Sequence, residues 1–133
     1  MGSNPIWNSK FFSEFPLSTH HSIFTNYIIH KIDALAGYIP SFLGKNIKVV
    51  DWLPQNDLLA HKDIKAFVSH VGHNSLYETA YHGVPVVAYP LFAEQDANAK
   101  KAERFGFGLA VNHRSTNAQQ LLETIELVIS EPR

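Results

Sequence analysis

Residues 66–89 read AFVSHVGHNSLYETAYHGVPVVAY, and this stretch decides the fold. Two short apolar runs, at 66–69 and 85–89, enclose a helical segment from Asn74 to His82 that Gly83 ends. A strand, a helix and a second strand in this order form a crossover unit whose two strands are parallel. The stretch therefore predicts a parallel sheet with a helix packed on one of its faces.

The same alternation continues on both sides of this unit. Strand-like apolar runs and helical patterns follow one another at 47–50, 57–61, 94–105 and 108–111. A final helix is expected to open at Thr116, because Gln119 stands at capping-box spacing from it. Its apolar face would comprise Leu121, Leu122, Ile125, Val128 and Ile129. The predicted fold class is α/β, with a Rossmann-like parallel sheet and flanking helices.

Residues 1–45 differ from the rest of the chain. They are rich in aromatic residues and irregular, apart from an apolar stripe at near-helical spacing that predicts a helix over 22–37. We therefore divide the chain into a divergent, partly helical N-terminal extension, residues 1–45, and a second domain, residues 46–133. We find no strand that leads into a turn of small residues, serine and glycine, within residues 1–45.

Composition and charge exclude several classes of protein. The chain has 133 residues, of which 45% are hydrophobic and 17% charged, and this is the composition of a globular protein. A formal net charge of -1 gives no electrostatic footprint for nucleic acid. The absence of cysteine excludes disulfides, thiolate metal ligands and a cysteine nucleophile. We also expect neither a signal peptide nor a membrane span, since no apolar run approaches roughly 18 residues.

Parallel sheets bind ligands at the carboxyl ends of their strands, where loops lead into helices. We call the residues that directly follow a strand its exit; the exit after the strand at 66–69 reads His70-Val71-Gly72-His73-Asn74-Ser75. Gly72 allows a tight turn, and the exposed N–H groups of the following helix would attract a phosphate. Glu78 lies about one turn along the helix, where its carboxylate suits a pair of vicinal hydroxyls. The alternative is that Asn74 and Ser75 only cap the helix and that Glu78 only complements its dipole.

Two further exits carry groups suited to a ligand. After the strand at 47–50, Trp52 could stack on a planar base, and Gln55 offers a donor and an acceptor to a base edge. After the strand at 85–89, Glu94 and Gln95 could hold the hydroxyls of a sugar. Each pair has a structural alternative, because Trp52 could pack in the core and acidic residues are common at helix starts.

Metal binding and nucleophilic catalysis find little support. His70 and His73 flank a glycine turn instead of sharing one helix face, and Glu78 is the sole acidic partner. A triad built on Ser69 or Ser75 lacks the spacing of a nucleophile elbow. We therefore expect no metal ligand in this chain.

Taken together, the three exits resemble the donor-binding signature of the UDP-glycosyltransferases, particularly the UDP-glucuronosyltransferase branch. The resemblance runs from about Asn46 to Pro132 and rests on many specified residues at fixed separations. The residues that carry it are 52–61, 66–75, Tyr77, Glu78, 81–85, 90–95 and Asn98.

The resemblance implies a site for a UDP-sugar. Trp52 would stack on the uracil, Gln55 would lie near the base and ribose, and Glu78 would accept the ribose hydroxyls. The residues that would hold the diphosphate are His70, Gly72, His73, Asn74 and Ser75, while Glu94 and Gln95 would touch the donor sugar. A protonated His70 could also stabilise the charge that develops on the departing UDP.

The resemblance further implies a GT-B type enzyme, in which two Rossmann-like domains face each other across the active site. Such enzymes transfer a sugar, here glucuronic acid or a hexose, from UDP-sugar to a small lipophilic acceptor with inversion. The UDP-sugar is a co-substrate, no cofactor is expected, and a complete enzyme would reside in the endoplasmic reticulum membrane. This chain resembles the C-terminal half alone. The general base belongs to the other half, so the isolated chain is expected to be inactive.

Several alternatives stay open at this point. Glu94 stands where the family usually has aspartate, which leaves the donor sugar undetermined. The chain could instead be a non-catalytic UDP-binding or dimerisation module that pairs with a full-length glycosyltransferase. It could belong to a glycosyltransferase with another donor, such as UDP-N-acetylglucosamine, or be a damaged fragment that does not fold.

Overall fold

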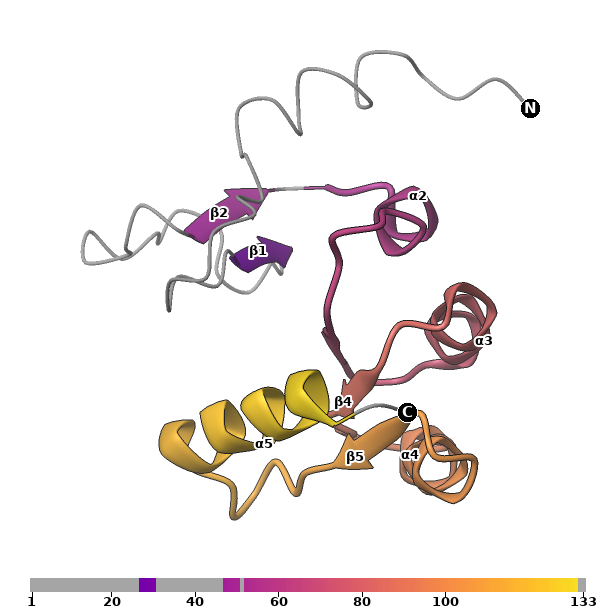
Figure 1. Cartoon of the computed structure of the whole chain (residues 1–133). Coiled ribbons are helices and arrows are strands. Elements are labelled where there is room, and N and C mark those ends of the chain that lie inside the picture. The colour runs from indigo at the N-terminus through magenta and orange to yellow at the C-terminus, as the bar shows by residue number, and fades with distance from the viewer. Residues whose placement is uncertain (1–26, 31–46, 51, 132–133) are drawn as a thin grey trace. The chain divides into compact units, whose positions relative to one another are not determined.

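The computed structural model describes residues 27–30, 47–50 and 52–131. The chain divides into two compact units, residues 1–53 and residues 54–133, which are described separately below. Figure 1 labels their helices and strands.

The first unit contains two parallel strands. β1 (Tyr27–His30) pairs with β2 (Ile47–Val50), and Tyr27 stands opposite Ile47 in the register. The helix predicted over 22–37 is therefore wrong at residues 27–30, which form a strand. An aromatic residue followed by two isoleucines favours an extended backbone, and a short apolar run fits both helical and strand spacing. The rest of the predicted helix lies outside the described residues.

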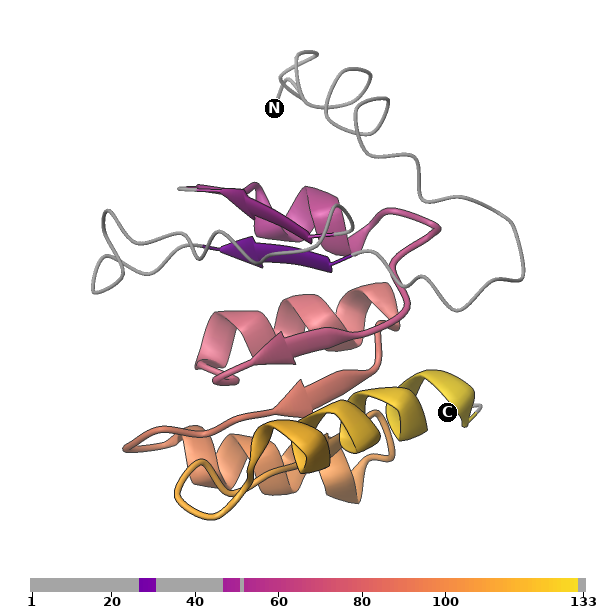
Figure 2. The same ribbon diagram turned by 90° about the vertical axis from the view of Figure 1, so that its left-hand side faces the viewer.

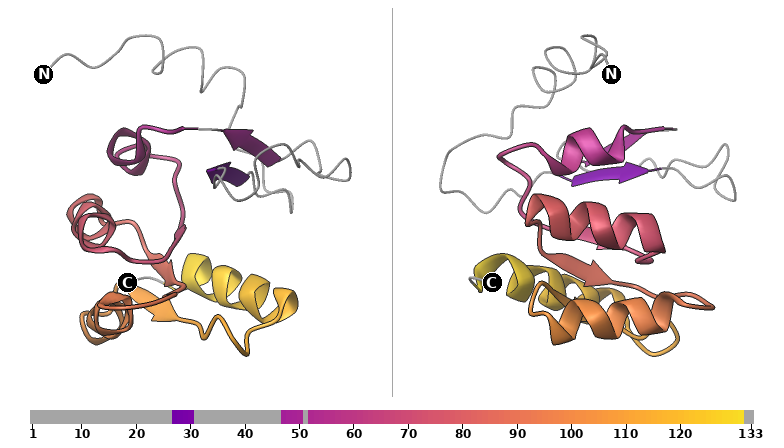
Figure 3. Two further views of the ribbon diagram at one scale, coloured as in Figure 1. Left: turned by 180° about the vertical axis from the view of Figure 1, so that it is seen from behind. Right: turned by 90° about the vertical axis from the view of Figure 1, so that its right-hand side faces the viewer.

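The second unit is built on a three-stranded parallel sheet. Its strands are β3 (Phe67–Ser69), β4 (Val86–Ala88) and β5 (Gly108–Ala110), in the order β3-β4-β5. The helices are α2 (Gln55–Leu59), α3 (His73–His82), α4 (Gln95–Arg104) and α5 (Ala118–Ser130). Helices α3 and α4 lie on one face of the sheet and α5 lies on the other, as opposite views show (Figures 2 and 3). This arrangement confirms the predicted α/β fold with a parallel sheet and flanking helices.

Successive residues of β4 point to opposite faces of the sheet and so enter two different cores. Val86 and Ala88 join the cluster on the α3 and α4 side, which also contains Val71, Leu76, Ala99 and Ala102. Val87 joins Val111 and Val128 on the α5 side. All three residues of β4 are fully buried, which explains why this strand reads as a continuous apolar run.

Strand β5 forms the edge of the sheet and is held closely against α4. A Cβ atom on Gly108 would lie 2.5 Å from Val86 Cγ1, 2.7 Å from the Val86 carbonyl oxygen and 3.1 Å from Ala102 Cβ. The backbone N–H of Ala110 donates to Glu103 Oε1 of α4 at 3.0 Å. The glycine thus permits close packing, while the Glu103 carboxylate satisfies an N–H group of the edge strand.

The helix ends confirm some of the predicted signals and correct others. Gly83 ends α3 in the left-handed region with φ 65°, as expected of a C-terminal glycine. The capping box of α5 lies one residue later than predicted: Asn117 Oδ1 accepts from the Gln120 N–H at 2.9 Å, and Gln120 Oε1 accepts from the Asn117 N–H at 2.9 Å. Thr116 instead closes the preceding turn, where its N–H donates to the Asn112 carbonyl at 2.8 Å and so is not available to the Gln119 side chain of the predicted capping box.

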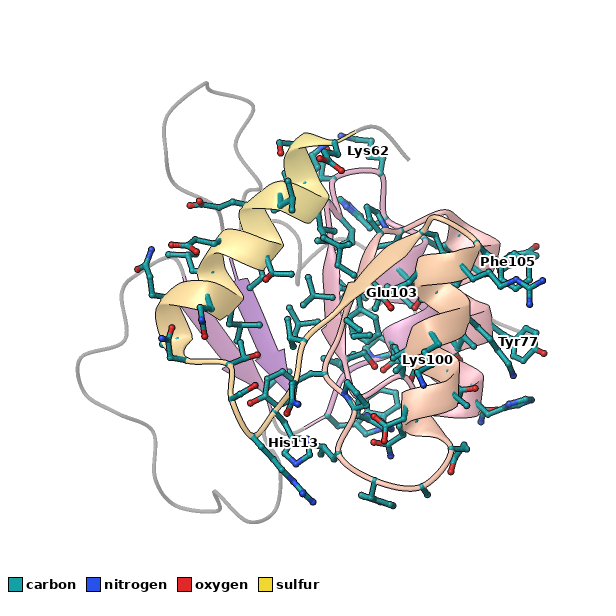
Figure 4. The ribbon with its side chains drawn as sticks, turned by 90° about the horizontal axis from the view of Figure 1, so that it is seen from below. Lys62, Tyr77, Lys100, Glu103, Phe105 and His113 are labelled. Carbon is teal, nitrogen blue, oxygen red and sulfur yellow. The ribbon has the colours of Figure 1, made fainter. Side chains whose placement is uncertain are left out.

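The apolar face of α5 is narrower than predicted. Leu121, Ile125 and Val128 pack against the sheet, whereas Leu122 and Ile129 are each 39% exposed. On the opposite side of the unit, Tyr77 and Phe105 point away from the sheet (Figure 4). Within the described ranges, no helix is both long and apolar enough to cross a membrane.

Candidate functional site

The loop that joins β3 to α3 has an unusual and firmly held backbone. Val71 has φ 54°, a left-handed conformation that β-branched residues rarely adopt, and its side chain is fully buried. The Val71 N–H donates to Ser69 Oγ at 3.0 Å, and Asn98 Nδ2 donates to the Val71 carbonyl at 3.0 Å. Strained backbone of this kind persists where its surroundings fix it, and it is common at binding sites.

His70 and Gly72 lie against each other at the start of α3. A Cβ atom on Gly72 would come within 2.7 Å of His70 Nε2. The imidazole is exposed and lies across Gly72, so glycine at this position leaves room for the ring beside the first turn of the helix. This places a side chain that can carry positive charge next to the positive end of the helix dipole.

The first turn of α3 has no side-chain cap. Gly72 occupies the N-cap position, and no side chain accepts a hydrogen bond there among the described residues. The alternative interpretation, that Asn74 and Ser75 only cap the helix, is therefore wrong, since both lie inside it. The reason is that the helix begins earlier than predicted, at His73, which moves these two residues past the capping position. The N–H groups of this turn thus have no side-chain acceptor, and such groups at a helix N-terminus favour an anion.

Three of the predicted site residues form a hydrogen-bonded cluster. Gln55, the first residue of α2, donates from Nε2 to Glu78 Oε2 at 2.7 Å and to Ser75 Oγ at 3.0 Å. Ser75 is buried, while Gln55 and Glu78 are half-buried. The two helices therefore present one carboxylate, one amide and one hydroxyl together, a set suited to sugar hydroxyls.

The loop that joins β4 to α4 is shaped by Gln95. This side chain is 4% exposed, and its Oε1 accepts hydrogen bonds from the Leu91 N–H at 2.8 Å and the Phe92 N–H at 3.3 Å. Ala93 in the same loop has φ 56°. Glu94, the N-cap of α4, is exposed. The two residues predicted to touch a donor sugar thus have different surroundings: the buried Gln95 side chain holds its own loop, whereas the Glu94 side chain is exposed.

Trp52 and the histidines complete the set of predicted residues. Trp52 belongs to the first unit and is 63% exposed. His73 is exposed and its ring contacts that of Tyr77 edge-on, with centroids 4.8 Å apart. Asn74 is exposed at the start of α3. Among the described residues, no group of three or more acidic and histidine side chains is arranged to hold a metal ion.

Within the described ranges, the ion pairs involve Asp63, which follows α2. Lys62 donates to both carboxylate oxygens of Asp63, at 2.9 and 3.0 Å, and this hydrogen bonding lowers the pKa of Asp63. Both residues follow α2, and the exposed Lys62 side chain is labelled in Figure 4. The possible serine nucleophiles have structural partners: Ser69 Oγ accepts from Val71, and Ser75 Oγ accepts from Gln55.

Two residues of structural importance for the site were not predicted as such. Ser69 entered the sequence argument only as a weak candidate nucleophile, and Asn98 only as one residue of a longer pattern. Asn98 is 2% exposed and stands three residues after Gln95 on the same helix. The sequence did contain a signal for this role. Two amide side chains three residues apart lie on the same face of a helix, and here that face also carries the buried alanines.

Comparison with known proteins identifies a family. The family model described as UDP-glucoronosyl and UDP-glucosyl transferase matches residues 29–133. The match begins earlier than the resemblance found from the motifs, which started at about Asn46, and it includes part of β1.

Characterised relatives match a limited part of their own length. The chain is 43% identical over 96 residues to UDP-glucuronosyltransferase 2A1 of Rattus norvegicus, an overlap that covers 72% of this chain and 18% of the relative. It is 44% identical over 97 residues to 2-hydroxyacylsphingosine 1-beta-galactosyltransferase of Homo sapiens, covering 73% and 18% of the two chains. The matched region is thus less than a fifth of either relative.

Solved structures share the fold. The glycotransferase of kitacinnamycin superposes with a TM-score of 0.73 at 23% identity, over 80% of this chain and 27% of that one. UDP-glucose: anthocyanidin 3-O-glucosyltransferase in complex with UDP gives a TM-score of 0.60 at 29% identity, over 65% and 20% of the two chains. These likenesses confirm the GT-B type of fold that the motifs predicted.

Proposed function

Because this chain belongs to the family of UDP-glucuronosyl and UDP-glucosyl transferases, we propose that it binds the UDP part of a UDP-sugar. The cluster of Gln55, Ser75 and Glu78 beside the start of α3 is the observation that carries the proposal. A nucleotide sugar needs donors for its phosphates and an acceptor for its ribose hydroxyls. The solved relative with UDP bound supports this ligand class.

The ribose would bind at Glu78. The carboxylate has two oxygens and about four acceptor positions, of which Gln55 uses one on Oε2. The remaining acceptor capacity suits two neighbouring hydroxyls, and Gln55 would keep the carboxylate in place while its own carbonyl oxygen faces the base or ribose. Charge-assisted hydrogen bonds of this type are stronger than neutral ones.

The diphosphate would bind at the N-terminal turn of α3. The uncapped N–H groups, the helix dipole and His70 all favour negative charge at this point. Asn74 and the backbone of Gly72 and His73 would contribute further donors. When the sugar leaves, charge builds up on UDP, and a protonated His70 would stabilise it.

The remaining assignments concern the sugar, the base and the whole enzyme. Exposed Glu94 would contact the donor sugar, with Gln95 close behind it. Stacking of uracil on Trp52 remains a prediction from the sequence. UDP is itself a good leaving group, so the reaction requires no cofactor in this proposal.

The whole enzyme would transfer glucuronic acid or a hexose to a small lipophilic acceptor with inversion, in the endoplasmic reticulum membrane. We propose that the general base comes from a partner domain and that this chain alone does not transfer sugar. Incubation of the purified chain with UDP-glucuronic acid, UDP-glucose and a phenolic acceptor should therefore give no conjugate. Detection of the conjugate would contradict this part of the proposal.

Calorimetric titration of the 133-residue chain with UDP, UMP and uridine tests the donor site. The expected result is saturable binding that weakens stepwise as phosphates are removed, because the start of α3 would contact them. Trp52→Ala should weaken all three ligands by about 1–3 kcal/mol if the base stacks on the indole. A well-folded chain that does not bind UDP would contradict the proposal.

A further inference from the structure

We infer that Asn98 is a positioning residue, which holds the β3–α3 loop in the conformation that binds the diphosphate. The inference rests on the proposed function of this loop. Asn98 lies on α4 and is 2% exposed, yet its Nδ2 reaches the carbonyl oxygen of Val71, 27 positions earlier in the chain, at 3.0 Å. Asn98 therefore acts through Val71 and does not contact the ligand itself.

Val71 is fixed at three points. Its side chain is fully buried in the core beneath α3 and α4, its N–H donates to Ser69 Oγ, and its carbonyl accepts from Asn98. Without these contacts, a valine at φ 54° would relax to negative φ, because its branched Cβ disfavours the left-handed region. The backbone of Val71 thus stays strained as long as its polar partners remain in place.

The strained residue stands between the two groups that meet at the start of α3. His70 precedes Val71 and Gly72 follows it, and the His70 ring lies across Gly72. A change in φ at Val71 would reorient the peptide groups on either side. It would move His70 away from the helix and turn the N-cap backbone, so that the donors no longer converge on one phosphate.

The N-terminal part of α4 holds the β3–α3 loop and the β4–α4 loop. Gln95 binds the Leu91 and Phe92 N–H groups of the β4–α4 loop, and Asn98, one turn later, binds the Val71 carbonyl of the β3–α3 loop. Two buried amides of one helix therefore fix the proposed sugar loop and the proposed phosphate loop relative to each other. This arrangement gives Asn98 a role beyond filling space in the core.

The test compares UDP with uridine on the full chain. Asn98→Ala should weaken UDP binding roughly tenfold or more, which is the loss expected when a buried acceptor is left unpaired. Uridine lacks phosphates, so its binding should change by less than about twofold, within measurement error. Val128→Ala is the matched control, because Val128 is equally buried but lies on the opposite face of the sheet. The control should keep the parent ratio of UDP to uridine affinity.

A ligand-free measurement separates the inference from the proposed function. Hydrogen exchange should accelerate in Asn98→Ala at two protected amides, that of Val71, which donates to Ser69 Oγ, and that of Leu76, which donates to the Gly72 carbonyl. Both should keep the parent rate, relative to global stability, in Val128→Ala. Ser69→Ala, which frees Val71 from its other polar partner, should reproduce the pattern and serves if Asn98→Ala fails to fold. If UDP and uridine weaken equally and the exchange of the Val71 and Leu76 amides is unchanged, Asn98 only stabilises the fold and the inference is overturned. If the parent binds neither ligand, the proposed function fails, and the exchange rates still decide whether Asn98 holds the loop.

Discussion

The two faces of the sheet β3-β4-β5 are built from different kinds of side chain. On the face that α3 and α4 cover, an apolar cluster is accompanied by buried polar residues. On the α5 face, the buried cluster consists of Val87, Val111 and Val128. The buried polar side chains of the described residues belong to the end of β3, to α3 and to α4; they are Ser69, Ser75, Thr79, Gln95 and Asn98.

This difference follows from what each face must support. Burying a polar group is unfavourable unless it is hydrogen-bonded, so such groups are retained where they hold something in place. The loops into α3 and α4 each contain a non-glycine residue with positive φ, Val71 and Ala93, and buried amides hold both loops. Helix α5 requires only apolar contact with the sheet and a capped start. One face therefore holds the two loops of the proposed site, whereas the other mainly stabilises the unit.

The largest expected effect is on the packing of β5 against β4 and α4. Gly108→Ala should lower the free energy of unfolding by about 3 kcal/mol, since the new Cβ would overlap Val86 and approach Ala102 and neither backbone can move freely. Urea denaturation would measure the loss. Gly106→Ala is the control: Gly106 has φ 75° but no atom within 4 Å of a new Cβ, so only conformational strain of about 1–2 kcal/mol is expected. Equal losses in the two variants would show that β5 is not closely packed.

On the α5 side of the sheet, removal of buried methyl groups should lower stability and leave ligand affinity unchanged. Val128→Ala should destabilise the chain by about 2 kcal/mol, because it removes two carbons from a fully buried site and leaves a small cavity. UDP affinity, measured below the unfolding transition, should stay at the parent value. A change in affinity with this variant would mean that the α5 face also contributes to the site, and the contrast between the faces would be wrong.

On the α3 and α4 side of the sheet, substitution of a proposed site residue should change ligand affinity more than the free energy of unfolding. Glu78→Gln should weaken UDP and uridine by about 1.5 kcal/mol, as expected for a lost charge-assisted acceptor, and should affect 2′-deoxyuridine less. The exposed Glu123 of α5, which accepts a hydrogen bond from Gln119, provides the control, and Glu123→Gln should bind all three ligands normally. Equal weakening of uridine and its deoxy analogue would remove Glu78 from the ribose hydroxyls.

The contrast between the faces was only partly predictable from the sequence. The alternation of apolar runs and helices, together with Gly83, predicted β3, α3 and β4, because local periodicity governs these elements. The strand at 27–30 was missed since its run of Tyr27, Ile28 and Ile29 also fits a helical stripe, and pairing with β2 decides between the two. The hydrogen bond from Asn98 to the Val71 carbonyl could not be predicted from the sequence, because it joins residues far apart in the chain and depends on a φ that valine disfavours.

The smallest expected effect concerns the start of α5, where the sequence signal was displaced by one residue. Asn117→Ala should lower the free energy of unfolding by about 1 kcal/mol, because it removes the side-chain acceptor of the Gln120 N–H. Thr116→Ala, at the position first expected to cap, should cost only a few tenths of a kcal/mol, since that residue uses its backbone N–H in the preceding turn and any residue supplies one. Thermal unfolding of both variants gives the comparison, and UDP affinity should be the same in each. If Thr116→Ala proved the more destabilising change, the cap would lie where the spacing alone had placed it. If either variant weakened UDP binding, helix α5 would contribute to the proposed site, and the contrast between the two faces would be wrong.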